Sequence, residues 1–428
     1  MSNKINRRAF LGMAAAGTAG IVLGDLMGLA NNGRASSNEE VLKSVEALGE
    51  DPSTIIDFYG ANQTGIVTPS QKFICMASFD VTTESVKDLQ KLLRDWSKMS
   101  AEMMAVKPWD GSQKDTQFPP ADTGEQVGLQ PASLTITIGF GSGLFEKDGK
   151  DRFGLASRKP KSFTRMPKFH GDLIQEMATH GDIVVQACAD DPMICFHVIR
   201  NLAKASRGSA HLRWQQAGQW GMKPGGTQRN LFGFKDGTNN PDINNIAFMN
   251  QNVWMDGTGD EPAWLKGGTF MVVRRVHMRI ETWDQVAYKE QEIIIGRQKP
   301  SGAPMDGKLE FDQPNFGADP SGNVTAVDSH VRLSNPRTGE ASERERILRR
   351  GFNFMNGLDP VGRVDAGLLF ICFNRSIEKQ FEPIQRRLTN PKMPDQMLAY
   401  TQTTGGGYYV VPPGAKDANS YIGEGLFN

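Results

Sequence analysis

Apolar and polar positions along the first half of the chain predict strands separated by helices. Residues 71–80 (QKFICMASFD), 133–140 (SLTITIGF) and 182–189 (DIVVQACA) are short β-rich runs, which predict three strands. Apolar residues recur at helical spacing over residues 86–96, and again after the helix start signal Asp191-Pro192. The first half therefore has the predicted order strand, helix, strand, strand, helix.

The second half repeats this plan. Residues 268–278 (GTFMVVRRVHM) and 367–373 (GLLFICF) predict strands. Thr282 and Gln285 have the spacing of a capping box, which predicts a helix that runs to about residue 294. Ser376 precedes another amphipathic stretch and is its predicted N-cap.

Helices that are apolar on one side only indicate antiparallel sheets with helices on one face. We therefore expect an α+β protein with a duplicated ferredoxin-like fold. Because the halves share the order of their elements rather than their sequence, a single irregular α+β domain is the alternative. The predicted divisions are a signal peptide at 1–35, a polar lead-in at 36–57, and two halves at 58–225 and 226–428.

Two long polar stretches rich in Gly and Pro, residues 206–262 and 296–345, interrupt the pattern. Loops of such length in a folded protein are usually functional or disordered. We expect the functional site to draw on them.

The first 35 residues differ from the rest. Arg7-Arg8 is followed by Phe10-Leu11 and by a weakly apolar run, rich in Ala and Gly, that reaches about residue 30. The pattern predicts a Tat-type export signal and hence a periplasmic or otherwise exported protein. The alternative is an ordinary N-terminal hydrophobic helix with a chance arginine pair. The run is too short and too Gly-rich for a membrane span, so we expect none in the mature form.

Composition narrows the class of protein. Of 428 residues, 39% are hydrophobic and 22% charged, which is typical of a globular chain. The 48 basic and 48 acidic residues cancel, and removal of residues 1–35 leaves a net charge of about −3, so no attraction to nucleic acid or anionic membranes is expected. The four cysteines form no CxxC or CxxCH, which argues against a disulfide scaffold, a zinc ribbon and covalently attached haem.

Three residues in or near the polar stretches are candidates for chemistry. His330 lies in AVDSHVR, Asp236 lies between glycines in GFKDGTNNP, and Arg349 opens an Arg-Arg-Gly sequence. Each has an ordinary alternative: a structural histidine, an Asp-Gly turn, and a solvated charged face. The six histidines include no HExxH or His-x-His spacing, which argues against a multi-histidine metal site.

Several of these motifs occur together in one known family. The set GFKDGT, DSHVRLSNPR, LRRG and GLLFICF resembles the dye-decolourising peroxidases. FYGANQTGI at 58–66 and GGGYYVVPPGAKDAN at 405–419 resemble its exported deferrochelatase/peroxidase branch. The resemblance runs from residue 58 to the C-terminus and implies a pair of ferredoxin-like halves, with haem held in the C-terminal half.

The resemblance also implies residue roles. His330 would be the axial ligand of the haem iron. Asp236 would be the distal acid/base and Arg349 its distal partner. Leu368 and Phe370 match the apolar pair that covers the distal face of the haem.

Further cofactor-binding candidates are less specific. Gly237 and Thr238 follow Asp236, and Arg332 is a candidate partner of a haem propionate. A carboxylate usually accepts a hydrogen bond from the far nitrogen of a ligating histidine, and Asp417 is the candidate for that role. In another branch of the family an asparagine stands two residues after the distal arginine. Position 351 is Gly here, so the role of that asparagine does not apply to this chain.

The implied activity is a peroxidase with one non-covalent haem b per chain. It would reduce hydrogen peroxide through a ferryl intermediate and oxidise dye-like, phenolic, porphyrinogen or metal-ion donors. Because the reference pKa of aspartate is near 4, a distal aspartate acting as base predicts activity that peaks in acid. The alternative is a haem-binding deferrochelatase that releases iron from haem in an iron-uptake system. Candidate partners are an iron-uptake permease and a second copy of the chain.

Overall fold

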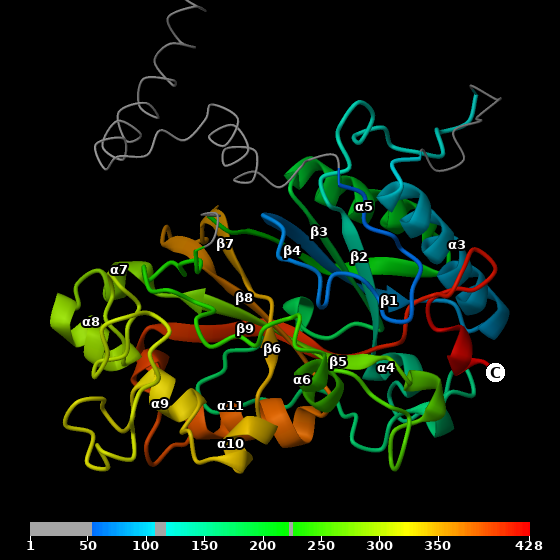
Figure 1. The fold of residues 1–428 in the computed structure, drawn as a ribbon. Helices are drawn as coiled ribbons and strands as arrows, with labels where there is room; N and C mark the ends of the chain where they lie inside the picture. The colour runs from blue at the N-terminus through cyan, green and yellow to red at the C-terminus, as the bar shows by residue number, and fades with distance from the viewer. Residues whose placement is uncertain (1–53, 108–116, 222–225) are drawn as a thin grey trace, which may run out of the picture. The chain divides into compact units, whose positions relative to one another are not determined.

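The computed structural model describes residues 54–107, 117–221 and 226–428. The predicted signal peptide and most of the predicted lead-in lie outside these residues. All described residues belong to a single contact unit, which Figure 1 shows as a ribbon.

The N-terminal half forms four antiparallel strands in the order β2-β3-β1-β4. Two helices, α3 and α5, connect β1 to β2 and β3 to β4. The bounds of these elements are β1 Phe73–Val81, α3 Val86–Met104, β2 Thr135–Gly141, β3 Ile183–Ala189, α5 Pro192–Ala205 and β4 Ala210–Gln219. The predicted helix start holds, because the Asp191 side chain accepts a hydrogen bond from the Met193 N–H.

The C-terminal half repeats this order with strands β7-β8-β5-β9, again antiparallel. Its strands are β5 Thr269–Met278, β6 Leu348–Arg349, β7 Phe352–Leu358, β8 Val364–Asn374 and β9 Thr401–Val411. The two-residue β6 pairs with β8 on the same edge as β7, since β5 occupies the opposite edge.

Short helices fill the connections of the C-terminal half. They are α6 Ile246–Asn252, α7 Ile280–Trp283, α8 Tyr288–Ile295, α9 His330–Ser334, α10 Glu340–Arg344, the π-helical turn η4 Ile377–Phe381 and α11 Glu382–Leu388. The remaining short segments are α4 Ser142–Phe145, η1 Ala156–Arg158, η2 Glu176–Ala178, η3 Ala263–Leu265, η5 Gln396–Ala399 and η6 Glu424–Leu426. No helix among the described residues has the length and apolar character to cross a membrane.

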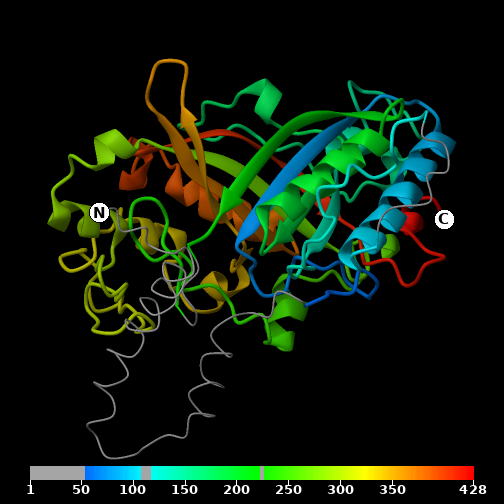
Figure 2. The ribbon, with the colours of Figure 1, turned by 90° about the horizontal axis from the view of Figure 1, so that it is seen from above.

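The two halves close one ring of strands. β2 pairs with β9 at Phe140↔Val410 and Gly141↔Tyr409, and β4 pairs with β7 at Gln219↔Asn353. The blue and green strands of the first half and the orange and red strands of the second lie side by side in Figures 1 and 2. The architecture is therefore α+β, with antiparallel strands that close into a barrel-like ring.

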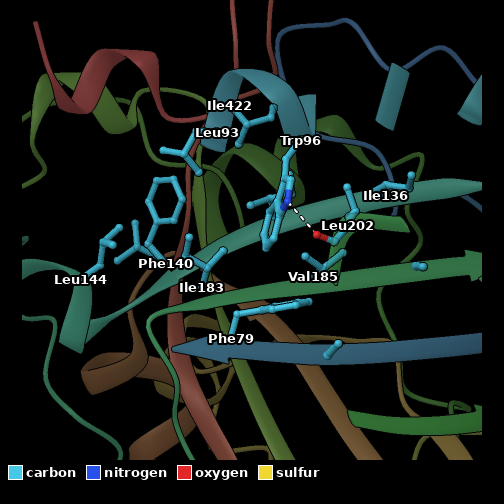
Figure 3. Packing of buried hydrophobic residues seen from close by; sticks show 14 of the residues in the cluster. Phe79, Leu93, Trp96, Ile136, Phe140, Leu144, Ile183, Val185, Leu202 and Ile422 are labelled. Carbon is cyan, nitrogen blue, oxygen red and sulfur yellow. Dashed lines mark hydrogen bonds between the residues drawn. The ribbon is translucent and has the colours of Figure 1, made fainter. Parts of the chain in front are cut away.

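The sheet faces away from α3 and α5 are not exposed, because the two halves pack against each other inside the ring. Met76 and Val184 of the first half belong to the same buried cluster as Val273 and Ile371 of the second. On the outer face of the first half, Trp96 packs edge-on against Phe79 and donates a hydrogen bond from Nε1 to the Leu202 carbonyl, which joins α3 to α5 (Figure 3).

Two expectations about elements were wrong. The capping box at Thr282 and Gln285 is absent: Thr282 lies inside α7, and α8 begins after Ala287 with no side-chain cap. The stretch 206–262 is not one long loop, since it contains β4 and α6.

Candidate active site

A large cavity lies on the outer face of the C-terminal strands. Its floor is formed by β5, β8 and β9, and its other walls by α9, α11 and the loop of residues 230–239. The cavity contains about 1750 Å³ of space, its open mouth included. The strands contribute side chains from alternate positions: β5 and β8 supply the apolar Val276, Met278, Leu368 and Phe370, and β9 supplies two threonines.

His330 lies at one wall of the cavity as the first residue of α9. Its Nδ1 is 2.6 Å from Oδ2 of Asp395, whose side chain is only 4% exposed. Oδ1 of the same carboxylate accepts a hydrogen bond from the Met397 N–H, which fixes the orientation of Asp395. Burial disfavours the charged imidazole, but the Asp395 carboxylate outweighs this effect and raises the pKa of His330.

The other ring nitrogen of His330 remains available. Among the described residues none hydrogen-bonds to Nε2, and one third of the side chain is exposed. A carboxylate on Nδ1 fixes the tautomer in which Nε2 is an acceptor and makes that nitrogen a better metal ligand. His330 thus lines the cavity with one ring nitrogen, Nε2, available to bind a metal ion.

Asp236 and Arg349 come together as predicted. The backbone N–H of Asp236 donates a hydrogen bond to the Gln228 carbonyl. The next residue, Gly237, has φ 130°, a conformation that favours glycine. Arg349, in β6, donates from Nη1 to Oδ1 of Asp236 at 2.8 Å. The side chain of Asp236 is 17% exposed and that of Arg349 is 31% exposed, so both remain accessible from the cavity.

This ion pair lies where two cavities meet. Asp236, Arg349, Leu368 and Phe370 line the large cavity and also a smaller, more polar one that extends toward Trp220. Leu368 and Phe370 therefore lie beside the ion pair in both cavities. Gly237 and Thr238 line the large cavity as well, and Thr238 donates a hydrogen bond to Glu310.

Two arginines in the cavity wall have no carboxylate within ion-pair distance among the described residues. Arg297 donates only to the carbonyls of Gly302 and Glu310, and burial together with nearby Arg337 lowers its pKa. Arg337 donates from Nη1 to Gln313, while its buried Nε has no partner in the part of the chain that the structure describes; burial also lowers the pKa of Arg337. A buried cation beside a second, half-buried one is costly unless an anion neutralises the pair.

Two predicted cofactor contacts have no support in the geometry. Arg332 does not line the cavity, because its guanidinium is held by Asp319 and by the Thr325 carbonyl. Asp417 is not the partner of His330; it lies in a turn near the C-terminus, where it accepts from the Asn419 N–H. Asp395, Arg297 and Arg337 also belong to the site, and none of them was predicted from the sequence.

The described residues contain no group of three or more His, Cys, Asp or Glu side chains that could hold a metal ion. The four cysteines are buried and unbridged: Cys75, Cys188 and Cys372 lie in strands, and Cys195 lies in α5. A single free imidazole nitrogen suits a metal that brings its other ligands with it, as haem iron does.

Comparisons with known proteins point to one family. Residues 63–219 match the family model described as Dyp-type peroxidase, N-terminal, and residues 227–416 match Dyp-type peroxidase, C-terminal. The chain is 38% identical over 378 residues to proteins named deferrochelatase from Escherichia coli (strain K12) and Shigella flexneri. These alignments cover 86% of this chain and 86% and 87% of the two relatives.

Solved structures that are similar to this chain include members of the same family. An oxyferrous complex of DtpA from Streptomyces lividans is similar with a TM-score of 0.78 and 32% identity, over 88% of this chain and 98% of that chain. A DyP-type peroxidase from Cellulomonas bogoriensis is similar with a TM-score of 0.77 and 33% identity, over 89% and 100%.

Proposed function

Because the chain belongs to the DyP-type peroxidase family, we propose that it binds one non-covalent haem b in the large cavity and reduces hydrogen peroxide there. Electrons come from a small donor of the dye-like, phenolic, porphyrinogen or metal-ion class. The observation that carries this proposal is that one cavity is lined both by the Asp236–Arg349 pair and by His330, whose Nε2 has no hydrogen-bond partner within residues 54–107, 117–221 and 226–428. In this proposal the halves are duplicated ferredoxin-like units, and the C-terminal one holds the haem.

The side chains of the cavity fit haem. His330 supplies one nitrogen ligand, and the porphyrin supplies the other four. Val276, Leu368 and Phe370 provide apolar surface for the macrocycle. Arg297 and Arg337, which lack carboxylate partners among the described residues, suit the two propionates, and they replace Arg332 in that role.

When bound, the haem iron supplies the two-electron redox chemistry that conversion of peroxide to water requires. Asp236 takes the proton from one peroxide oxygen on Oδ2 and returns it to the other oxygen, which leaves as water. Oδ1 of Asp236 is held by Arg349, so the carboxylate keeps one orientation throughout. The guanidinium of Arg349 stabilises the negative charge that develops on the departing oxygen. Leu368 and Phe370 limit the water that reaches the pair.

Single-turnover kinetics test these roles. Haem-loaded wild type, Asp236→Asn and Arg349→Leu are mixed with hydrogen peroxide over a range of concentrations, with Asp242→Asn in the same loop as the matched control. We expect the second-order rate constant to fall about 10²–10⁴-fold for the first variant and about 10²–10³-fold for the second, while the control stays near wild type. Wild-type rates in both distal variants would refute the proposed roles.

The names of the relatives favour a second candidate function. Proteins 38% identical to this chain are called deferrochelatase, so release of iron from haem with the porphyrin left intact is the alternative. Chromatography of the tetrapyrrole separates the two functions. Metal-free protoporphyrin and free iron, formed without peroxide, would favour the alternative. Donor oxidation that depends on peroxide and leaves the haem unchanged would favour the peroxidase.

We also propose export through the Tat pathway, on the strength of Arg7-Arg8 and the apolar run after them. Replacement of both arginines by lysine should keep the full-length chain in the cytoplasm. Export that is unchanged by this double substitution would contradict the proposal.

A further inference from the structure

Asn240 lies on the same turn as Asp236. The Asn240 N–H donates to the Gly237 carbonyl at 2.7 Å, which closes the turn directly after the distal aspartate. Gly237 adopts a positive φ of 130°, so the chain reverses sharply at this point. As a result, the side chains of Asp236 and Asn240 both reach the strand β6 that carries Arg349.

The amide of Asn240 makes two hydrogen bonds to the backbone of Arg349. Nδ2 donates to the Arg349 carbonyl at 2.9 Å, and Oδ1 accepts from the Arg349 N–H at 2.8 Å. A planar amide that donates and accepts side by side reproduces what a neighbouring strand would offer. Asn240 therefore pairs with Arg349 in place of a strand.

The position of Arg349 in the sheet explains why this partner is needed. β6 pairs with β8 on one side, where the N–H of Arg350 donates to the Ile371 carbonyl at 2.8 Å. Backbone groups of successive strand residues point to opposite sides, so the N–H and carbonyl of Arg349 point away from β8. Without Asn240, both groups would lack a partner among the described residues.

We propose that Asn240 is a positioning residue that sets the place of the Arg349 guanidinium relative to Asp236. Loop and strand are joined at two points, by the Asn240 amide through the backbone and by the Asp236–Arg349 pair through the side chains. The backbone link fixes where the arginine side chain begins, and hence where its guanidinium can lie. This inference rests on the distal roles of Asp236 and Arg349 in the proposed function.

The other side of β6 is anchored independently. The buried Arg350 donates from its guanidinium to the carbonyls of Thr68 and Pro69 and to Gln71 of the N-terminal half. Arg350 thus fixes the strand to the first half, whereas Asn240 fixes it to the loop of Asp236. Only the second link joins the two distal side chains, so Asn240 is the residue to test.

The first measurement uses haem-free protein and is independent of catalysis. Amide hydrogen exchange is followed at Arg349 in wild type, Asn240→Ala and Asn240→Asp. Asn244→Ala is the control, because Asn244 lies in the same loop and its side chain donates to Asp242 rather than to β6. We expect exchange of the Arg349 amide to be about tenfold faster or more in Asn240→Ala. It should stay near wild type in Asn240→Asp, which keeps the acceptor, and in the control.

The second measurement is the affinity of the haem-loaded protein for cyanide, an anion that the distal arginine would stabilise. Asn240→Ala removes both hydrogen bonds to the Arg349 backbone, and since these act on cyanide only through the guanidinium, the dissociation constant should rise about fivefold, the size of one neutral hydrogen bond. Asn240→Asp should also weaken binding, because it loses the donor to the Arg349 carbonyl and places a second carboxylate beside the arginine. If Asn240→Ala does not fold, cyanide binding by Asn240→Asp still tests the positioning role.

The outcomes distinguish failure of the positioning role of Asn240 from failure of the proposed function. Unchanged exchange at Arg349 in Asn240→Ala, or faster exchange with unchanged cyanide affinity in both Asn240 variants, would overturn the positioning role. Failure of the proposed function has a different signature: Arg349→Leu itself would leave cyanide affinity and peroxide reactivity at wild-type levels. The exchange of Arg350, whose amide bonds to Ile371, is the internal reference and should not change.

Discussion

Replacement of Asp395 by asparagine should change the electron density on the imidazole of His330, the proposed haem ligand. The carboxylate accepts from the imidazole through Oδ2 at 2.6 Å and from the Met397 N–H through Oδ1 at 2.9 Å. An amide has only one acceptor oxygen, so the variant cannot serve both donors and also loses the negative charge. In haem-free protein the pKa of His330 should fall, because Asp395 is what raises it.

The expected size follows from the burial of this pair. A hydrogen bond to a charged group contributes about 1.5–3 kcal/mol, and Asp395 is 4% exposed, so solvent screens it little. The carboxylate stabilises ferric iron more than ferrous iron, because ferric iron carries more positive charge. Its loss therefore makes reduction easier. One electron and 1.4 kcal/mol correspond to about 59 mV, so the reduction potential of the loaded protein should rise by about 60–130 mV.

Spectroelectrochemical titration of the haem-loaded protein measures this shift. Asp417→Asn is the matched control, because Asp417 is the partner suggested by the sequence and makes no contact with His330. The control should keep the wild-type potential. A shift below about 20 mV in Asp395→Asn, or an equal shift in the control, would refute the reasoning.

Three further outcomes are expected. Asp172 forms a buried ion pair with Arg274, and Asp172→Ala leaves that arginine without its counter-charge. The free energy of unfolding in urea should therefore fall by about 3–5 kcal/mol, and a loss under about 1 kcal/mol would contradict this. Burial lowers the pKa of His180 to about 4, so the unfolded chain binds a proton that the native chain does not between about pH 6.5 and 4, and stability falls as the pH falls through that window. His180→Asn, which tolerates the φ of 62°, should flatten that dependence in denaturation curves, and an unchanged slope would count against it. Arg297→Ala and Arg337→Ala should each weaken haem binding about tenfold or more by fluorescence titration, whereas Arg332→Ala should not; equal effects in all three would reject the propionate assignment.

The strands that the sequence pattern predicted are buried along most of their length. β1, β3, β5 and β8 carry near-continuous apolar runs, and each was expected within one to three residues of its observed start. β4 was missed because its sequence AHLRWQQAGQ is mostly polar and only partly buried. Its neighbours in the ring stabilise it, and a window of sequence does not contain them.

β9 was missed for a related reason. Its run of three glycines lowers strand propensity, yet the backbone there lies against β5. A Cβ on Gly406 would come within 2.0 Å of the Val273 carbonyl oxygen, so glycine is required by close approach rather than by a turn. The closure of the ring through β2–β9 and β4–β7 likewise depends on contacts between distant segments.

The site shows the same division. Asp236, His330 and Arg349 belong to motifs that can be matched in sequence, and the structure brings all three to one cavity. Asp395 lies 65 residues after His330 and also accepts from a nearby backbone N–H, which by itself is typical of an ordinary turn. Its role is visible only in the folded chain. The cavity-facing Arg297 was missed for the same reason.

The most direct test of the account is the coordination of iron in the haem-loaded protein. Electron paramagnetic resonance and absorption spectra are recorded for wild type, His330→Ala and His277→Ala, whose histidine bonds instead to the Val364 carbonyl. The account predicts an axial nitrogen signature in wild type and in His277→Ala, its loss in His330→Ala, and its return when imidazole is added. A His330→Ala protein that keeps the wild-type spectrum would contradict the assignment of the haem site.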